Sequence, residues 1–214
     1  MDEYIVTTSL EYLQKLNQTL EWMKRHVKFE DFRDSIILEL GTGYGFFMRH
    51  FIDDFPEDSY YVAVDYNLNA LTWLKRVIER TNPKCNVIYL CAHFDALHLK
   101  PNVVDVLLDI SGSSNYAFDS DTFLLDKMQE LVKPGAMLLG SYILFEKVSA
   151  RSKIPAPNRW QFSAELIKNH LAKLGYVKLD DMTTVSVSKG GPMENFFTES
   201  EKVFQWIFYG KKTD

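Results

Sequence analysis

Hydrophobic positions along the chain follow two spacings, one typical of helices and one typical of strands. In the first segment the apolar residues recur every three to four positions with charged residues between them, which predicts an amphipathic helix, and four later segments that follow apolar runs are predicted as helices as well. These predicted helices span residues 9–28, 44–55, 67–80, 120–132 and 163–174. Pro56 and Gly175 directly follow two of them, and both residue types commonly end helices.

Short apolar runs lie between the predicted helices and have the length of strands. They cover residues 36–40, 60–64, 86–91, 103–110 and 136–145. The fourth run is apolar apart from Asp105 and Asp109, as expected for a strand that is buried on both faces of a parallel sheet. Strands that alternate with helices predict an α/β fold.

The last third of the chain departs from this alternation. Lys133-Pro134-Gly135 is predicted as a turn, and residues 146–160 are predicted as a surface loop because they contain prolines and cations without periodicity. Residues 177–188 and 202–209 are prone to form strands and flank a Gly-Gly-Pro segment, which predicts an antiparallel pair. We therefore expect one three-layer domain with a seven-stranded, mostly parallel sheet that ends in this pair.

Composition narrows the classes of function. The chain has 214 residues, 46% of them hydrophobic, enough for the core of one domain. The net charge of −5 makes nucleic acid and anionic membranes unlikely partners, because both attract clustered cations. No apolar stretch reaches 18 residues, the first residues do not predict a signal peptide, and Cys85 and Cys91 suggest no disulfide framework. A cytoplasmic protein is expected.

Three glycines mark the predicted functional site. Gly41, Gly43 and Gly45 lie between the first apolar strand and the following helix, where glycine lets the backbone turn sharply and approach a ligand closely. Asp65 follows 20 residues after Gly45, at the end of the next strand. A glycine turn with an acidic residue at this distance predicts a crevice that binds a nucleoside-containing ligand.

Three other kinds of site fit the chain less well. Dinucleotide-binding turns place a third glycine where this chain has Phe46, whose side chain would obstruct the contact between helix and sheet. A phosphate-binding loop requires Gly-Lys-Ser or Gly-Lys-Thr, which does not follow the turn. The histidines show no metal-ligand spacing with cysteines or carboxylates, so no metal site is expected.

The glycine turn resembles the first motif of the class I, Rossmann-like methyltransferases that use S-adenosyl-L-methionine. That motif has an acidic residue, one spacer and then Gly-x-Gly-x-Gly, which matches Glu39-Leu40-Gly41-Thr42-Gly43-Tyr44-Gly45. The resemblance extends over residues 36–209 and implies residues 1–34 as an N-terminal helical lid on a Rossmann-like core of residues 35–214. It departs in one place, because residues 95–102 are too few for a full helix between the third and fourth strands.

The resemblance also implies which residues contact the cofactor and its product, S-adenosyl-L-homocysteine. Gly41 and Gly43 are expected at the methionine and ribose, Asp65 at both ribose hydroxyls, and Asp95 at the adenine amine. Asp109 is expected where the amino-acid part of the cofactor meets the acceptor. The complete predicted set is Glu39, Gly41, Thr42, Gly43, Gly45, Asp65, Tyr66, Phe94, Asp95, Ala96 and Asp109.

In-line methyl transfer mainly requires alignment, and positioning alone can supply about 7 to 11 kcal/mol. A general base is needed only for a protonated acceptor, and the sequence leaves it open among His93, Asp109, Tyr116 and Asp119. The resemblance implies an acceptor pocket above the strand ends, and the aromatic residues expected there favour a small-molecule acceptor. They are Tyr4, Tyr12, Tyr116, Phe118, Trp160 and Phe162.

Besides a less favoured relative that transfers an aminopropyl group, two alternatives to a small-molecule methyltransferase remain open. One is methylation of RNA or protein, although Asp109-Ile110-Ser111-Gly112 replaces the Asn-Pro-Pro-Tyr motif of amino-directed base methylases. The other is a non-catalytic module of the same fold that only binds S-adenosylmethionine. The sequence does not indicate an oligomeric state.

Overall fold

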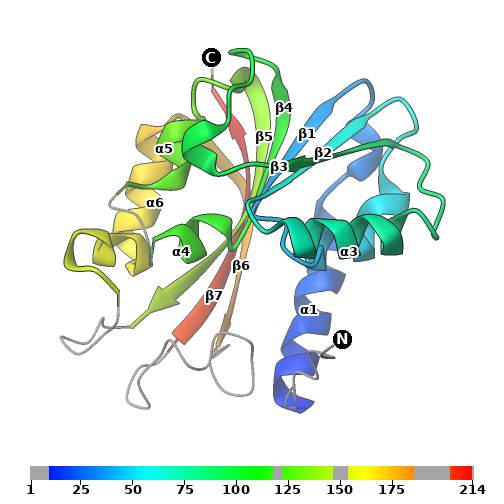
Figure 1. Ribbon diagram of the computed structural model, residues 1–214. Coiled ribbons are helices and arrows are strands. Elements are labelled where there is room, and N and C mark those ends of the chain that lie inside the picture. The colour runs from blue at the N-terminus through cyan, green and yellow to red at the C-terminus, as the bar shows by residue number, and fades with distance from the viewer. Residues whose placement is uncertain (1–9, 118–121, 147–153, 186–202, 214) are drawn as a thin grey trace.

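The computed structural model describes residues 10–117, 122–146, 154–185 and 203–213. Seven strands form one sheet in the order β3-β2-β1-β4-β5-β7-β6 (Figure 1). The first five strands are parallel, and β7 runs antiparallel to both β5 and β6, which confirms the predicted fold class. The strands are β1 (Ile36–Leu40), β2 (Tyr60–Asp65), β3 (Asn86–Cys91), β4 (Val104–Ile110), β5 (Val132–Phe145), β6 (Tyr176–Val185) and β7 (Val203–Lys212).

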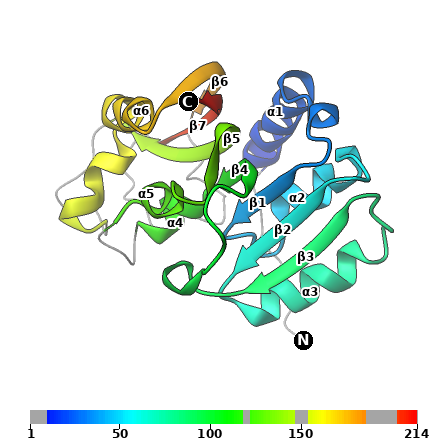
Figure 2. The same cartoon turned by 90° about the horizontal axis from the view of Figure 1, so that it is seen from above.

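Helices cover both faces of the sheet and give three layers (Figure 2). One face carries α1 (Leu10–His26), η1 (Phe29–Asp31), α2 (Phe46–Phe51), η2 (Ile52–Asp54) and α3 (Leu68–Ile78). The other carries η3 (Phe94–Ala96), α4 (Gly112–Tyr116), α5 (Leu124–Met128), η4 (Ala156–Phe162) and α6 (Ala164–Lys173). Within the described parts of the chain, every helix is too short or too polar to cross a bilayer.

An aromatic cluster fills the core under α1 and α2. The rings of Phe29 and Phe51 stack at 5.1 Å, and Phe47 packs against Phe51 at 4.7 Å. Trp22 and Met23, in the second half of α1, are buried in the same cluster. Large buried rings contribute strongly to core stability, so this part of α1 belongs to the folded core.

The connection from β3 to β4 contains no α-helix, as its length predicts. It forms the single 3-10 turn η3, and beyond it Leu97 and Leu99 pack against the core below α4 and α5. Two leucines thus cover part of the surface that a helix would bury. Backbone hydrogen bonds from Ala92 to Asp65 and from Asn102 to Glu130 hold the two ends of this segment.

The Lys133-Pro134-Gly135 segment was predicted as a turn, but it forms a bulge inside β5. Val104 pairs with Val132, whereas Val106 pairs with Met137, so β5 contains three extra residues between the two pairs. Gly135 has a positive φ of 76°, which glycine adopts readily within such a bulge.

The predicted helix 120–132 was too long, because its last residue belongs to β5. Val132 belongs to β5, and α5 covers only Leu124–Met128. The apolar Leu131 and Val132 continue a helical spacing in the sequence although Val132 pairs with β4.

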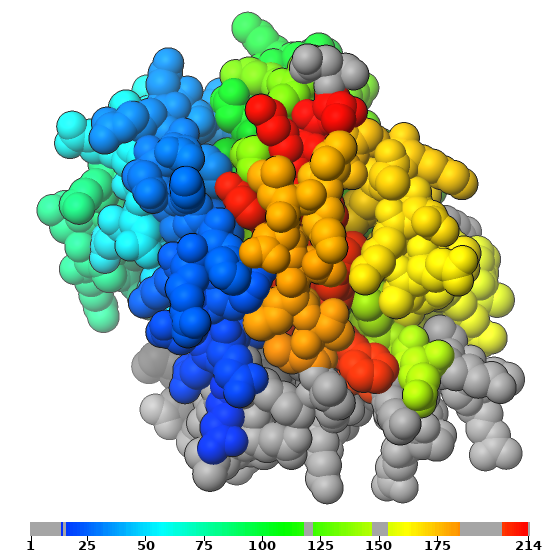
Figure 3. Space-filling model, turned by 180° about the vertical axis from the view of Figure 1, so that it is seen from behind, coloured from blue at the N-terminus to red at the C-terminus, as the bar shows by residue number. Residues whose placement is uncertain are grey.

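Two further segments differ from their predictions in detail. Residues 44–55 do not form one helix, because α2 ends at Phe51 and the tighter η2 follows. The described part of the predicted loop 146–160 contains the start of η4. From behind, the edge strand β6 is seen between α1 and α6, with Val177 and Leu179 about half exposed (Figure 3).

Candidate functional site

A cavity of about 730 Å³ opens where β1, β2, β3 and β4 end. This volume is typical of sites for small molecules and cofactors. The strand order reverses between β1 and β4, and ligands of open α/β sheets bind at such a reversal. The cavity is lined by Gly41, Gly43, Tyr44, Asp65, Tyr66, Asn67, Ala70, His93, Phe94, Asp95, Gly112, Asn115 and Tyr116.

The floor of the cavity is bare backbone. A Cβ atom added to Gly43 would find no atom closer than 3.9 Å, so any side chain there would project into the cavity. A Cβ atom on Gly41 would lie 3.5 Å from the Cα of Gly112. The first two glycines therefore leave room for a ligand to contact main-chain atoms.

Gly45 has a different role from the other two glycines. It precedes α2 with a positive φ of 68°, and a Cβ atom there would lie 2.2 Å from a methyl carbon of Leu74 on α3. Gly45 does not line the cavity. The third glycine of the motif thus permits the close packing of α2 against α3.

Asp65 connects the glycine turn to the next strand. Its Oδ2 accepts a 2.7 Å hydrogen bond from the backbone N–H of Gly43, and its Oδ1 accepts one of 2.8 Å from the N–H of Asn67. A carboxylate oxygen can accept two hydrogen bonds, so each oxygen keeps one acceptor position. Asp65 lines the cavity and can serve a ligand with two neighbouring hydroxyl groups.

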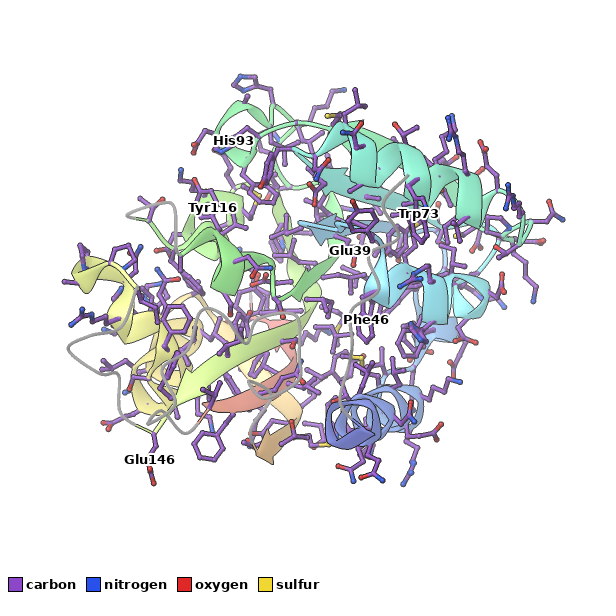
Figure 4. All side chains as sticks on the ribbon, turned by 60° about the horizontal axis from the view of Figure 1, so that its bottom comes forward. Glu39, Phe46, Trp73, His93, Tyr116 and Glu146 are labelled. Carbon is purple, nitrogen blue, oxygen red and sulfur yellow. The ribbon has the colours of Figure 1, made fainter. Side chains whose placement is uncertain are left out.

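Glu39 lies in β1, directly before the glycine turn, and does not line the cavity (labelled in Figure 4). Its side chain is buried, and the hydroxyl of Tyr61 donates a 2.7 Å hydrogen bond to its Oε2. Burial raises the pKa of Glu39 to about 7, although the hydrogen bond from Tyr61 opposes that rise. Glu39 therefore supports the turn from the protein interior.

Asp109 also acts from the interior. It is fully buried at the end of β4, and its Oδ1 accepts a 2.7 Å hydrogen bond from the backbone N–H of Ser113 in α4. Burial raises its pKa to about 6. The bond holds the start of α4 where a Cβ atom on Gly112 would lie only 2.4 Å from the carbonyl oxygen of Leu40. This close approach makes Gly112 part of the cavity wall.

The wall opposite α3 is aromatic and acidic. The rings of Phe94 and Tyr116 meet edge to face at 5.7 Å, and His93 lies beside them (Figure 4). The Tyr116 hydroxyl donates a 3.1 Å hydrogen bond to Asp95, which also contacts Lys127 of α5. The hydrogen bond from Lys127 lowers the pKa of Asp95 despite the small opposing effect of burial.

The structure brings together part of the set named from sequence. Gly41, Gly43, Asp65, Tyr66, Phe94 and Asp95 line the cavity, together with the candidate bases His93 and Tyr116. The remaining cofactor candidates do not line it; they are Glu39, Thr42, Gly45, Ala96 and Asp109. Sequence reasoning missed Tyr44, Asn67, Ala70, Gly112, Asn115 and, behind the wall, Lys127.

Of the aromatic residues predicted above the acceptor, Tyr116 lines the cavity, whereas Phe162 is buried and Trp160 packs against the core. Tyr4, Phe118, the side chain of Tyr12 and the candidate base Asp119 lie outside the described residues. Across the described ranges, no group of three or more histidine, cysteine or acidic side chains is arranged to hold a metal ion.

Comparison with known proteins gives one family. The model of a methyltransferase domain family matches residues 37–135, which include the glycine turn, Asp65, Asp95 and Asp109. A search of curated proteins found no match.

Solved structures of low sequence identity share the fold. A sarcosine dimethylglycine methyltransferase from Galdieria sulphuraria, described as putative, has a TM-score of 0.68 and 13% identity, covering 97% of this chain and 92% of its own. A Bacillus halodurans protein, also described as a putative methyltransferase, has a TM-score of 0.68 and 12% identity, with coverages of 92% and 100%. The Haemonchus contortus phosphoethanolamine N-methyltransferase 2, solved with phosphomonomethylethanolamine and S-adenosylhomocysteine, has a TM-score of 0.63 and 17% identity, with coverages of 92% and 53%.

Proposed function

We propose that this chain is a class I methyltransferase that uses S-adenosylmethionine and that its acceptor is a small molecule. The observation that carries the choice of acceptor is the chemistry of the cavity wall. Among the residues that the structure describes, the cavity lining contains aromatic rings, two carboxylates and two asparagines, and no lysine or arginine. A site for RNA would place cations beside the reacting atoms to meet phosphates. The Haemonchus contortus enzyme, solved with the small molecule phosphomonomethylethanolamine, supports the same choice.

The residues of the cavity fit the cofactor that this family uses. Bare backbone at Gly41 and Gly43 leaves space for the ribose and methionine, and the free acceptor positions of Asp65 suit the two ribose hydroxyls. Phe94 offers an aromatic surface to the base, with Asp95 beside it as an acceptor for the adenine amine. S-adenosylmethionine supplies a methyl group that its sulfonium already activates.

The chain's own contribution in this proposal is alignment and exclusion of water. Asp109 is fully buried and bonded to Ser113, so its role is to hold the wall and not to accept a proton from the substrate. His93 and Tyr116 line the cavity, and the Tyr116 hydroxyl is already engaged with Asp95 and Lys127. His93 contacts Asp95 as well, with its Nδ1 3.1 Å from Oδ2, so both candidate bases lie at the end of the cavity proposed for adenine and neither is assigned as a general base.

We also propose that residues 1–34 act as a lid, anchored where Trp22 and Met23 of α1 are buried in the core. The cytoplasmic location remains a prediction from the sequence.

Labelled methyl donor tests the acceptor class directly. The protein is incubated with a metabolite extract, total RNA and denatured cell protein in separate reactions, with Asp65→Ala as the blank. Label in the metabolite fraction that depends on Asp65 supports the proposal. Label confined to RNA or protein overturns it in favour of a macromolecular acceptor. Binding of S-adenosylhomocysteine without label in any fraction overturns it in favour of a non-catalytic module.

A further inference from the structure

The connection from β3 to β4 lacks an α-helix, yet it supplies Asp95 to the cavity wall. The side chain of Asp95 is 52% exposed, and within its own turn it is contacted by His93, whose Nδ1 lies 3.1 Å from Oδ2. An exposed carboxylate on a short turn samples several rotamers unless other groups hold it. The neighbouring side chains therefore decide where its acceptor oxygens point.

Two residues from two other elements hold Asp95. The Nζ of Lys127 in α5 donates a 2.9 Å hydrogen bond to the hydroxyl of Tyr116 in α4. That hydroxyl donates a 3.1 Å hydrogen bond to Oδ1 of Asp95, and Lys127 also contacts the same oxygen. A hydroxyl has one proton, so Tyr116 donates a hydrogen bond to Asp95 and accepts one from Lys127. The hydrogen bonds therefore run in one direction, from Lys127 through Tyr116 to Asp95.

Lys127 lies behind the cavity wall and does not line the cavity. Its Nζ also sits 5.3 Å from the centre of the Tyr116 ring, so the cation fixes the ring as well as the hydroxyl. The ring in turn contacts Phe94, and Phe94 approaches Gly41 across the cavity floor. One lysine thus supports both the acidic and the aromatic part of this wall.

Stability does not account for this arrangement. Exposed ion pairs add about 0 to 1 kcal/mol, and the Lys127 and Asp95 side chains are 30% and 52% exposed. The lowered pKa of Asp95 and the raised pKa of Lys127, each caused first by the hydrogen bond between them, keep both groups charged. An ionised Asp95 is a hydrogen-bond acceptor only, and it faces the cavity.

We propose that Lys127 is a positioning residue that fixes Asp95 and Tyr116 so that this end of the cavity selects a purine with an amino group at C6. The proposal rests on the cofactor site described above. An amino group at C6 donates a hydrogen bond to the oriented carboxylate of Asp95. An oxygen at C6 is itself an acceptor, so it makes no hydrogen bond with that carboxylate. A purine bound over Asp95 would remove its carboxylate from water, so an analogue that cannot donate to it leaves the carboxylate without a hydrogen bond and binds more weakly.

Two ligands and calorimetric titration test the proposal. S-adenosylhomocysteine carries the amino group, and S-inosylhomocysteine carries oxygen in its place. We expect the wild type to prefer the first by about 30-fold or more, a part of the discrimination that hydrogen bonds provide. Lys127→Met should lower affinity for S-adenosylhomocysteine by about tenfold and leave that for S-inosylhomocysteine nearly unchanged. The measured quantity is the ratio of the two affinities.

Three further variants separate positioning from general damage. Lys127→Arg retains a donor cation and should restore most of the preference. Tyr116→Phe keeps the ring but removes the hydroxyl and should lose part of the preference. Lys173→Met changes an exposed lysine on α6 and should behave as the wild type. Thermal unfolding of each variant verifies that it is folded before titration.

The outcomes distinguish this inference from the proposed function. A wild type that binds neither ligand overturns the cofactor site itself. A wild type that prefers S-adenosylhomocysteine, with the same ratio in Lys127→Met, overturns the role of Lys127 alone. An equal loss of affinity for both ligands in Lys127→Met also overturns it, because that result indicates a general structural role.

Discussion

The backbone N–H of Gly43 donates a 2.7 Å hydrogen bond to Oδ2 of Asp65, joining the turn after β1 to the end of β2. The other oxygen of Asp65 accepts from Asn67, whose own side chain caps α3. One carboxylate thus fixes the glycine turn and the start of α3 before any ligand arrives. A site that is already ordered loses less entropy when it binds.

Asp65→Ala should weaken binding of S-adenosylhomocysteine about 100-fold, because hydrogen bonds to a charged group contribute about 1.5 to 3 kcal/mol each. The variant loses both the acceptors for the ligand and the bond that orders Gly43. Calorimetric titration measures the change. Asp58→Ala, at an exposed turn away from the cavity, is the matched control. A dissociation constant within threefold of the wild type would contradict the assignment of Asp65.

Gly43→Ala should separate binding from folding. The added methyl group meets no atom closer than 3.9 Å, so the stability cost is limited to about 1 to 2 kcal/mol for a positive φ of 53°. The methyl group projects into the space assigned to the cofactor, and we expect at least a 50-fold loss of affinity, or about 2.3 kcal/mol. Urea unfolding and titration on the same preparation give both quantities. Full affinity in a folded Gly43→Ala protein would place the ligand elsewhere.

Gly45→Ala should do the opposite and mainly destabilise the fold. Its methyl carbon would lie 2.2 Å from Leu74, and such overpacking costs about 1 to 3 kcal/mol in addition to the strain of a positive φ. The double variant Gly45→Ala, Leu74→Ala removes the clash but leaves a cavity. A double-mutant cycle should therefore give a favourable coupling of about 1 kcal/mol or more. Additive effects of the two changes would show that Leu74 is not the obstacle.

The order of the elements could be predicted from sequence because each strand and helix has its own hydrophobic spacing. Even the short connection after β3 was identified from its length alone. The bulge at Lys133-Pro134-Gly135 could not, since Pro and Gly are typical of turns and only pairing between Val104 and Val132 reveals a strand there. Pairing between distant residues leaves no local signal in the sequence.

The site residues also divide into those that the sequence predicts and those that depend on how the elements pack. The motif identified Gly41, Gly43 and Asp65, because a bare turn and a carboxylate have recognisable spacing. The spacing of the glycines could not distinguish those that face the cavity from Gly45, which permits helix packing. The role of Gly45 depends on how close Leu74 lies to it in the folded protein. Lys127 carries no motif and reaches the site only because α5 packs beside α4.

The buried pair of Glu39 and Tyr61 should make stability depend on pH. Burial raises the pKa of Glu39 from 4.5 to about 7, so the folded protein holds a proton that the unfolded chain releases between these values. Stability from this group is complete below about pH 4.5 and is lost as the pH rises through 7. Asp109, whose pKa burial raises to about 6, adds to the trend in the same direction.

Glu39→Gln isolates the contribution of Glu39, since glutamine stays neutral and its carbonyl oxygen can accept the hydrogen bond that Tyr61 donates. The variant and the wild type should have similar free energies of unfolding at pH 5. At pH 8 the variant should be more stable by up to about 3 kcal/mol, because a tenfold change in acidity corresponds to about 1.4 kcal/mol. Urea unfolding at pH 5, 6.5 and 8 measures the difference, with the exposed Glu57→Gln as control. A difference that stays constant with pH would mean that Glu39 is ionised in the folded protein throughout, and that Tyr61 stabilises a buried carboxylate.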